Sequence, residues 1–183
     1  MSIWKFAKAL FSMRKEMKAA MEREKAYLTM NVTELSALGD GQLYEAAKAR
    51  MEKRLNTYPD MQAAFDQFPQ PLRIFFALDY LELEVANGGL CQFFVNSSRL
   101  VAPYISEYLG QIGAWEHKAL YDDFIERNQI DRTDLSSFRI RDLSEYEAQT
   151  KRYPFDEFDD RFYDLPPMET YLTKLVRENI AEF

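Results

Sequence analysis

The sequence has little of the residue types that build metal sites, disulfides and glycine-rich loops. One cysteine (Cys91), one histidine (His117) and six glycines stand among 183 residues. A single cysteine cannot form an intramolecular disulfide, and one cysteine with one histidine cannot supply the clustered ligands of a zinc site. We therefore expect no metal, no cofactor and a reducing compartment.

A long apolar run is also missing. No uninterrupted apolar stretch approaches the ~20 residues that span a bilayer. Near the N-terminus, Lys5 and Lys8 interrupt the segment in which a signal peptide would need a hydrophobic region. These features predict a cytoplasmic protein that does not bind membranes.

The residues that are present indicate a folded, all-α chain. Hydrophobic residues make up 47% and aromatic residues 15%, which is enough for one core in a chain of this length. Leu72–Ala86 is apolar nearly all round, which predicts a buried central helix. Within it Leu81–Val85 alternates like a strand, but fifteen apolar residues exceed the usual strand length of ~5–6. Further helices are predicted at 42–55, 61–68, 89–97, 103–110, 114–128, 142–151, 155–164 and 167–181.

Residues 3–28 show the pattern of an amphipathic helix. Its apolar face comprises Ile3, Phe6, Ala7, Leu10, Met13, Met17, Ala20 and Met21, and its opposite face Lys5, Lys8, Ser12, Lys15, Lys18 and Glu22. Such a helix can lie on an anionic membrane, on a partner or on its own body, and we favour contact within the molecule or an oligomer. We divide the chain into this basic helix (1–30), a helical connecting segment (31–69) and a compact helical domain (70–183).

Charge is distributed unevenly along the chain. Residues 1–25 hold seven basic and three acidic side chains, whereas residues 119–169 hold seven and fourteen, and the whole chain has a net charge of −7. An acidic body repels nucleic acid and favours basic partners, although such a charge also serves solubility. The basic helix and the acidic region are complementary, so we expect them to touch within one chain or between two chains of a homodimer.

The most distinctive stretch is EVANGGLCQFFVN, residues 84–96, which we call the polar corner. Its two glycines lack the spacing and the following lysine of a phosphate-binding loop. We expect Asn87 or Gly88 to take the left-handed conformation at the end of the central helix, and Gly89 to let the next helix leave without a clash. Phe93 and Phe94 should then turn back into the core.

The other members of the polar corner are polar groups among apolar neighbours. Glu84, Gln92 and Asn96 are predicted to hydrogen-bond across the corner and to satisfy the exposed helix ends. The same groups could instead line a pocket for a small ligand. We favour the structural interpretation, because buried polar groups are normally satisfied within the protein.

The polar corner resembles the signature of the bacterial DNA-mimic-protein family, a domain of largely unknown function named after a member that imitates DNA. The resemblance rests on Glu84, Asn87-Gly88-Gly89, Gln92-Phe93-Phe94 and Asn96, followed in order by Ile112-Gly113-Ala114 and Phe158-Asp159-Asp160-Arg161-Phe162-Tyr163. It covers residues 70–183 and implies an all-helical fold and a bacterial source. Ala86 and Leu90 depart from the family pattern without disturbing the Asn-Gly-Gly core. Proteins that share a fold need not bind the same partner, so the resemblance does not identify a partner for this chain.

No catalytic constellation stands out. Any histidine-based triad would need His117, and nothing beside it resembles a nucleophile elbow. Carboxylates one helical turn apart, such as Asp122 and Glu126, lack the Glu-x-x-His pattern of di-iron bundles. We therefore predict that the protein is not an enzyme.

The acidic segment FDEFDDRFYD, residues 155–164, carries the functional hypothesis. As a helix it places Phe155, Phe158 and Phe162 on one face and three aspartates on another, with Glu157 able to pair with Arg161. Asp159 lies nearer the aromatic face and is expected to bond Tyr163 or a backbone amide. The outer acids can be a solvated face or an anionic strip presented to a basic protein.

The resulting prediction is a non-enzymatic interaction protein whose acids occupy the DNA site of a basic DNA-binding protein, without binding nucleic acid itself. The acids proposed to contact the partner are Asp122, Asp123, Glu126, Asp156, Asp160 and Asp164, which we call the acidic surface. The alternative is a helical domain, similar to an immunity protein, that binds a small ligand or peptide at the polar corner.

Overall fold

The computed structural model describes residues 3–183, and the side chains of Ile3, Trp4, Phe6, Ala7 and Ala9 lie outside the description. The described chain forms the α-helices α1 (Ile3–Tyr27), α2 (Val32–Ser36), α3 (Asp40–Leu55), α4 (Met61–Gln67), α5 (Gln70–Val95), α6 (Ile105–Gln111), α7 (Trp115–Arg127), α8 (Leu143–Thr150), α9 (Phe155–Tyr163) and α10 (Met168–Glu178). Three 3₁₀ segments accompany them: η1 (Ser97–Tyr104), η2 (Ser136–Phe138) and η3 (Ile180–Glu182).

The prediction of an all-α fold is confirmed, since residues 3–183 contain no strand. The alternating segment Leu81–Val85 lies inside α5, as its apolar length predicts. Across these residues, no helix combines the length and the apolar character that crossing a membrane would require.

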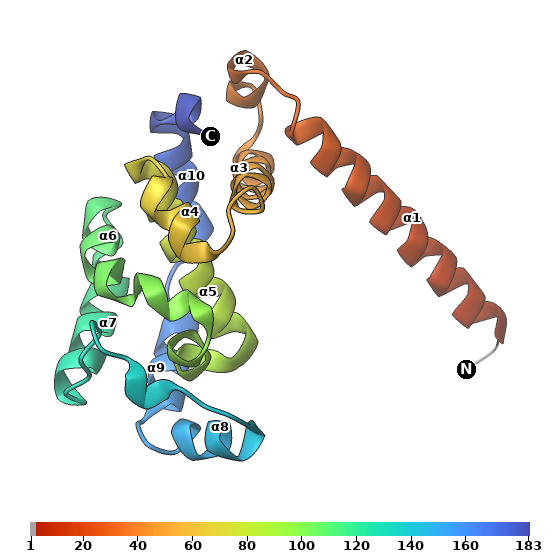
Figure 1. Ribbon diagram of the computed structural model, residues 1–183. Coiled ribbons are helices and arrows are strands. Elements are labelled where there is room, and N and C mark those ends of the chain that lie inside the picture. The colour runs from red at the N-terminus through yellow and green to blue at the C-terminus, as the bar shows by residue number, and fades with distance from the viewer. Residues whose placement is uncertain (1–2) are drawn as a thin grey trace.

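Helix α5 is the centre of the fold (Figure 1). It packs against α10, α9, α6 and η1. Phe75, Phe76, Leu78 and Leu81 have 0% exposure, because α5 is surrounded by neighbours on all sides of its first half. The segment 31–69 also contributes to this core: α3 packs against α10 and buries Leu43, Ala46, Ala47 and Met51.

A kink divides α5 into two helical pieces at Gly88 and Gly89, the position where the sequence predicts a helix end. The prediction of which residue is left-handed was wrong. Gly88 has an extended φ of −166°, whereas Gly89 has φ 79° and ψ 176°, a conformation that is essentially restricted to glycine. The second piece carries Phe93 and Phe94, which have 0% exposure as expected.

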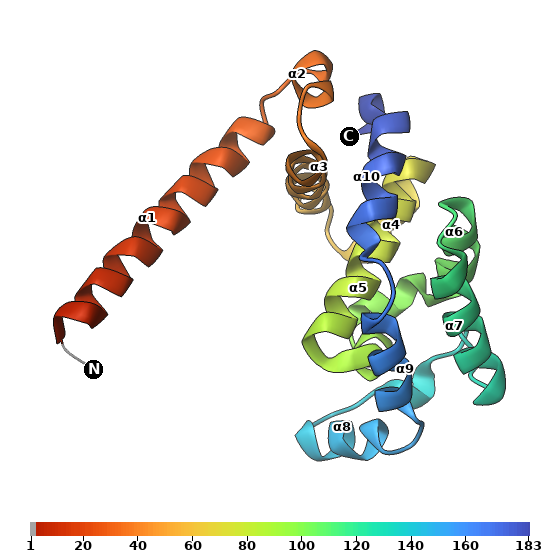
Figure 2. The same cartoon turned by 180° about the vertical axis from the view of Figure 1, so that it is seen from behind.

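Helix α1 points away from the rest of the molecule (Figures 1 and 2). The described contacts that hold it lie at its C-terminal end: Tyr27 is buried and donates to Glu45 of α3, and Arg50 donates to the Tyr27 carbonyl oxygen. Within one chain, the predicted contact between α1 and residues 119–169 is therefore absent from the described residues. Contact between two chains stays a prediction.

Candidate functional site

Glu84 organises the polar corner. Its carboxylate is 8% exposed and accepts three hydrogen bonds. Gln92 Nε2 donates to Oε2 at 2.7 Å, Asn96 Nδ2 donates to the same oxygen at 2.8 Å, and Ser98 Oγ donates to Oε1 at 2.8 Å. The predicted bonds across the corner are present, and both carboxylate oxygens are engaged. The prediction that these side chains satisfy the exposed helix ends was wrong, since their described bonds run between side chains. This arrangement favours the structural interpretation over a ligand pocket.

The backbone groups released by the kink also find partners. Asp159 of α9 accepts from the Leu90 amide at 2.8 Å, and Tyr163 donates to the Val85 carbonyl oxygen at 2.8 Å. Tyr146 of α8 donates to the Gly88 carbonyl oxygen at 3.1 Å. Because α-helices leave backbone groups unpaired wherever they break, these side chains replace lost helical bonds. The prediction that Asp159 bonds a backbone amide is confirmed.

The close approach of α9 explains why glycine occupies the kink. A Cβ on Gly89 would lie 2.0 Å from Asp159 Oδ2, and one on Gly88 would lie 2.2 Å from Gln92 Oε1. Asn87, the remaining polar residue of the corner, is exposed. The Gly-Gly pair is thus a docking point for α9 rather than an anion-binding loop.

Burial shifts the pKa values of two groups beside the kink. Desolvation raises the pKa of Asp159 from 3.8 to about 6, with further contributions from the like charges of Asp156 and Asp160, against the Leu90 bond. Desolvation also raises the pKa of the buried Cys91 thiol to about 11. Cys91 therefore stays protonated near neutral pH, unlike a nucleophilic cysteine.

Two aspartates of α9 and Asp164, which directly follows the helix, lie on its outer side. Phe155, Phe158 and Phe162 are buried, while Asp156, Asp160 and Asp164 are exposed, as the sequence predicts. No ion pair within residues 3–183 reaches any of the three aspartates. Helical spacing puts neighbouring members about 5–6 Å apart, so together they form a line of uncompensated charge.

The acids of α7 are in a different electrostatic situation. Asp122 pairs with Lys118 and lies 3.8 Å from Arg132. Asp123 lies 2.6 Å from Arg127 and 3.6 Å from Arg161. The expected Glu157–Arg161 pair is wrong, since Arg161 reaches across to α7.

Glu126 is the exception on α7. It is exposed and has no ion pair within the described residues. The structure thus places the acidic surface on two adjacent helices, and most of its uncompensated charge is on α9.

Sequence reasoning missed several polar residues that lie in contact. Tyr146 and Ser98 join the polar corner through folding contacts that no local spacing indicates. Asp79 is 2% exposed in the middle of the apolar run 72–86, and an acid in such a run is the one sign that could have identified it. It bonds Tyr44 and Lys48 of α3.

The single histidine is a packing residue. His117 is 2% exposed and lies edge-on to Phe162 and Tyr171, with ring centroids 5.3 and 5.7 Å away. Burial lowers its pKa, which favours the neutral ring. The described residues contain no group of three or more histidine, cysteine, aspartate or glutamate side chains placed to hold a metal ion.

Comparison with protein families agrees with the resemblance seen in the sequence. The family described as DMP19-like protein matches residues 66–179, from the end of α4 through α10. Neither a curated protein nor a solved structure matches the chain. The matched region contains the kink, the polar corner and both acidic helices, and the chain belongs to the DMP19-like protein family.

Proposed function

We propose that this protein is a non-enzymatic DNA mimic, whose acidic surface occupies the DNA-binding site of a basic protein. The observation that carries the proposal is the line of Asp156, Asp160 and Asp164 on the outer side of α9. Family membership is consistent with it, because DMP19 is a DNA-mimic-protein family.

The physical argument begins with rigidity. Duplex DNA presents a dense, regular array of phosphates, so a mimic has to hold carboxylates at comparable spacing. Helix α9 is fixed by its three buried phenylalanines and by the Asp159 and Tyr163 bonds to the kink of α5. The exposed aspartates therefore project from a backbone that is anchored on both flanks.

The distribution of ion pairs ranks the six acids. Within residues 3–183 no ion pair reaches Asp156, Asp160, Asp164 or Glu126, whereas Asp122 and Asp123 pair with basic neighbours. A basic partner gains more from uncompensated carboxylates, because it does not have to displace an existing cation. We expect α9 to contribute most of the contact with the partner and α7 to lie at the periphery of that contact.

Affinity capture from a bacterial lysate at low and high salt, followed by competition with duplex DNA, tests the proposal. A mimic retains a DNA-binding protein at low salt, releases it at high salt and loses it to added duplex. The triple variant Asp156→Asn, Asp160→Asn, Asp164→Asn should lose the captured protein.

The matched control is the triple variant Asp66→Asn, Glu107→Gln, Glu178→Gln. It changes the net charge equally through exposed acids on α4, α6 and α10. The control should bind like the unmodified protein. Capture that ignores both salt and DNA, or equal losses in the two triple variants, would rule out the mimic.

A further inference from the structure

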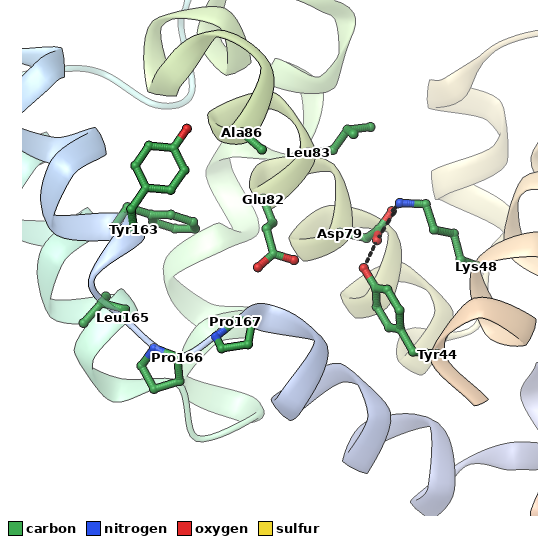
Figure 3. A pocket seen from close by; sticks show the side chains of 11 residues that line it. Tyr44, Lys48, Asp79, Glu82, Leu83, Ala86, Tyr163, Leu165, Pro166 and Pro167 are labelled. Atoms are coloured by element: carbon green, nitrogen blue, oxygen red, sulfur yellow. Dashed lines mark hydrogen bonds and ion pairs between the residues drawn. The ribbon is translucent and has the colours of Figure 1, made fainter. Parts of the chain in front are cut away.

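A cavity of about 470 Å³ lies where α3, α5 and the link between α9 and α10 meet (Figure 3). Its volume is in the range of small-molecule sites. Leu83 of α5 and Phe162, Leu165 and Pro166 of the α9–α10 region give it apolar walls. Of the polar corner only Ala86 lines it, and neither Glu84, Gln92 and Asn96 nor the outer aspartates of α9 do.

The charged group at the α3 side of the cavity is already satisfied. Asp79 accepts from the Tyr44 hydroxyl, and Lys48 Nζ lies 3.1 Å from its Oδ1 and 3.0 Å from its Oδ2. Figure 3 shows both partners directed at Asp79. The buried carboxylate and its ammonium neutralise each other, so this end of the cavity offers a fixed polar wall without a free charge.

Glu82 differs from Asp79 because only half of its carboxylate is used. Its Oε1 accepts from the Met168 amide at 2.7 Å, at the first turn of α10. Within residues 3–183, no hydrogen bond or ion pair reaches Oε2. In Figure 3 the side chain stands between the Asp79 group and the wall formed by Tyr163, Leu165 and the two prolines.

The free Oε2 of Glu82 determines which class of ligand the cavity can bind. A carboxylate in apolar surroundings gains most from a charged hydrogen-bond donor. A guanidinium prefers to engage both carboxylate oxygens, but one is held by the Met168 amide. An ammonium group needs only one oxygen, and an alkyl chain behind it would cover the apolar walls. An anion is disfavoured because two carboxylates and one lysine line the cavity.

We propose that this cavity binds an aliphatic ammonium group, with the nitrogen at Glu82 and the alkyl chain against Leu83, Leu165 and Pro166. Two sources can supply this group: a free alkylamine, or a lysine side chain of a protein. The binding of the group itself does not depend on DNA mimicry.

Nuclear magnetic resonance titration of the full chain tests the proposal with matched probes. The charged probes are pentylamine and Nα-acetyl-lysine methylamide, and their uncharged counterparts are 1-pentanol and Nα-acetyl-norleucine methylamide. The charged probes should shift the resonances of Leu83, Ala86 and Leu165, with affinity at least about tenfold above the uncharged ones. Nα-acetyl-arginine methylamide should bind more weakly than the lysine probe.

Variants separate recognition from folding. Glu82→Gln keeps an oxygen for the Met168 amide, so the fold should persist while affinity for both charged probes falls about tenfold or more. Ala86→Phe, at an exposed lining position, should block the cavity without loss of stability. Glu169→Gln removes a carboxylate from the same turn of α10 outside the lining, and should bind within about threefold of the unmodified protein.

The outcomes are distinct. Binding of both charged probes identifies the ammonium-bearing chain as the recognised group, and binding of the lysine probe alone assigns the site to a protein. Equal affinity for charged and uncharged probes, shifts centred elsewhere, or full affinity in Glu82→Gln would overturn the proposal. Failure of the DNA-competition experiment would leave these titrations unaffected.

Discussion

Asp159 accepts a hydrogen bond from the backbone amide of Leu90, with 2.8 Å between Oδ1 and N, across 69 residues of sequence. In an unbroken helix that amide would donate to the carbonyl oxygen of Ala86. The kink at Gly88 and Gly89 frees the amide, and α9 supplies the replacement acceptor. This contact lies on the same side of α9 as its three buried phenylalanines, and Asp156 and Asp160 face outward. The glycine pair and the acidic surface are therefore parts of one arrangement.

Replacing Gly89 with alanine should lower the free energy of unfolding by about 2 kcal/mol or more. The residue would have to adopt a conformation that costs of order 1–3 kcal/mol for non-glycine residues, and its Cβ would meet Asp159. Urea unfolding followed by circular dichroism measures the change. Gly88→Ala should cost less, because its φ is extended and the Gln92 side chain can move.

Gly110→Ala is the control for that comparison. Gly110 lies in α6, and a Cβ there would meet its neighbours at an ordinary 3.5 Å. Alanine in a helix should be neutral or stabilise the protein by up to about 1 kcal/mol. Equal effects at positions 88, 89 and 110 would contradict the role of the positive φ at Gly89.

The raised pKa of Asp159 predicts a specific pH dependence of stability. Burial shifts this pKa from 3.8 to about 6 in the folded protein, so the folded state holds the proton more tightly than the unfolded state. The contribution of Asp159 to stability is full below about pH 4 and is lost as pH rises through about 6. Relative to Asp159→Asn, the unmodified protein should gain stability as pH falls from 7 to 4.5.

Urea unfolding of both proteins across that range isolates this effect from the other carboxylates. Titration of the Asp159 side-chain carbon resonance should have its midpoint near pH 6. Asp156→Asn should lower that midpoint, since it removes a like charge that raises the pKa of Asp159. Parallel stability profiles for the two proteins would show that Asp159 titrates as an ordinary carboxylate.

The sequence predicts the helices and the polar corner because both depend on local spacing. The apolar run of residues 72–86 is apolar on nearly all sides and longer than a typical strand, which favours a buried helix, and Glu84, Gln92 and Asn96 lie within thirteen residues of each other along the chain. Ser98, Tyr146 and the Asp79–Lys48 pair were missed. Their contacts form where separate helices pack together. The spacing of residues along the sequence does not reveal that packing.

The positive φ at Gly89 likewise depends on tertiary contacts as well as on the local sequence. Sequence reasoning placed it at Asn87 or Gly88, the usual site of a helix C-cap. The chain instead resumes a helix immediately and admits Asp159 at the kink, so the glycine-only conformation falls on Gly89. Tertiary docking of α9 therefore decides which glycine is constrained.

Glu84→Ala should destabilise the protein by about 1–3 kcal/mol, because the buried Ser98 hydroxyl and the amides of Gln92 and Asn96 lose their acceptor. Glu84→Gln should be intermediate, since its amide nitrogen would face other donors. Thermal and urea unfolding measure both variants. Glu107→Ala, which removes an exposed acceptor of Gln111 on α6, should change stability by less than about 0.5 kcal/mol. Wild-type stability in Glu84→Ala would show that the corner bonds do not hold the kink.

Helix α1 is expected to join two chains into a dimer. Its described apolar side chains are unusually open: Phe11 is 74% exposed, and Met13, Met17 and Met21 are all more than half exposed. Exposed apolar stripes of this kind mark interaction surfaces, and residues 1–25 carry a net charge of +4 opposite the −7 of residues 119–169.

Because the described contacts of α1 with the body lie near Tyr27, removal of residues 1–18 should leave the midpoint of thermal unfolding unchanged within about 2 °C at concentrations where the full chain is monomeric. Sedimentation should show a dimer for the full chain and a monomer for the truncated chain at equal concentration. Met13→Ser with Met17→Ser and Met21→Ser keeps the charge of α1, and should weaken the dimer if the apolar stripe forms the contact. A full chain that sediments as a monomer would contradict dimerisation through α1.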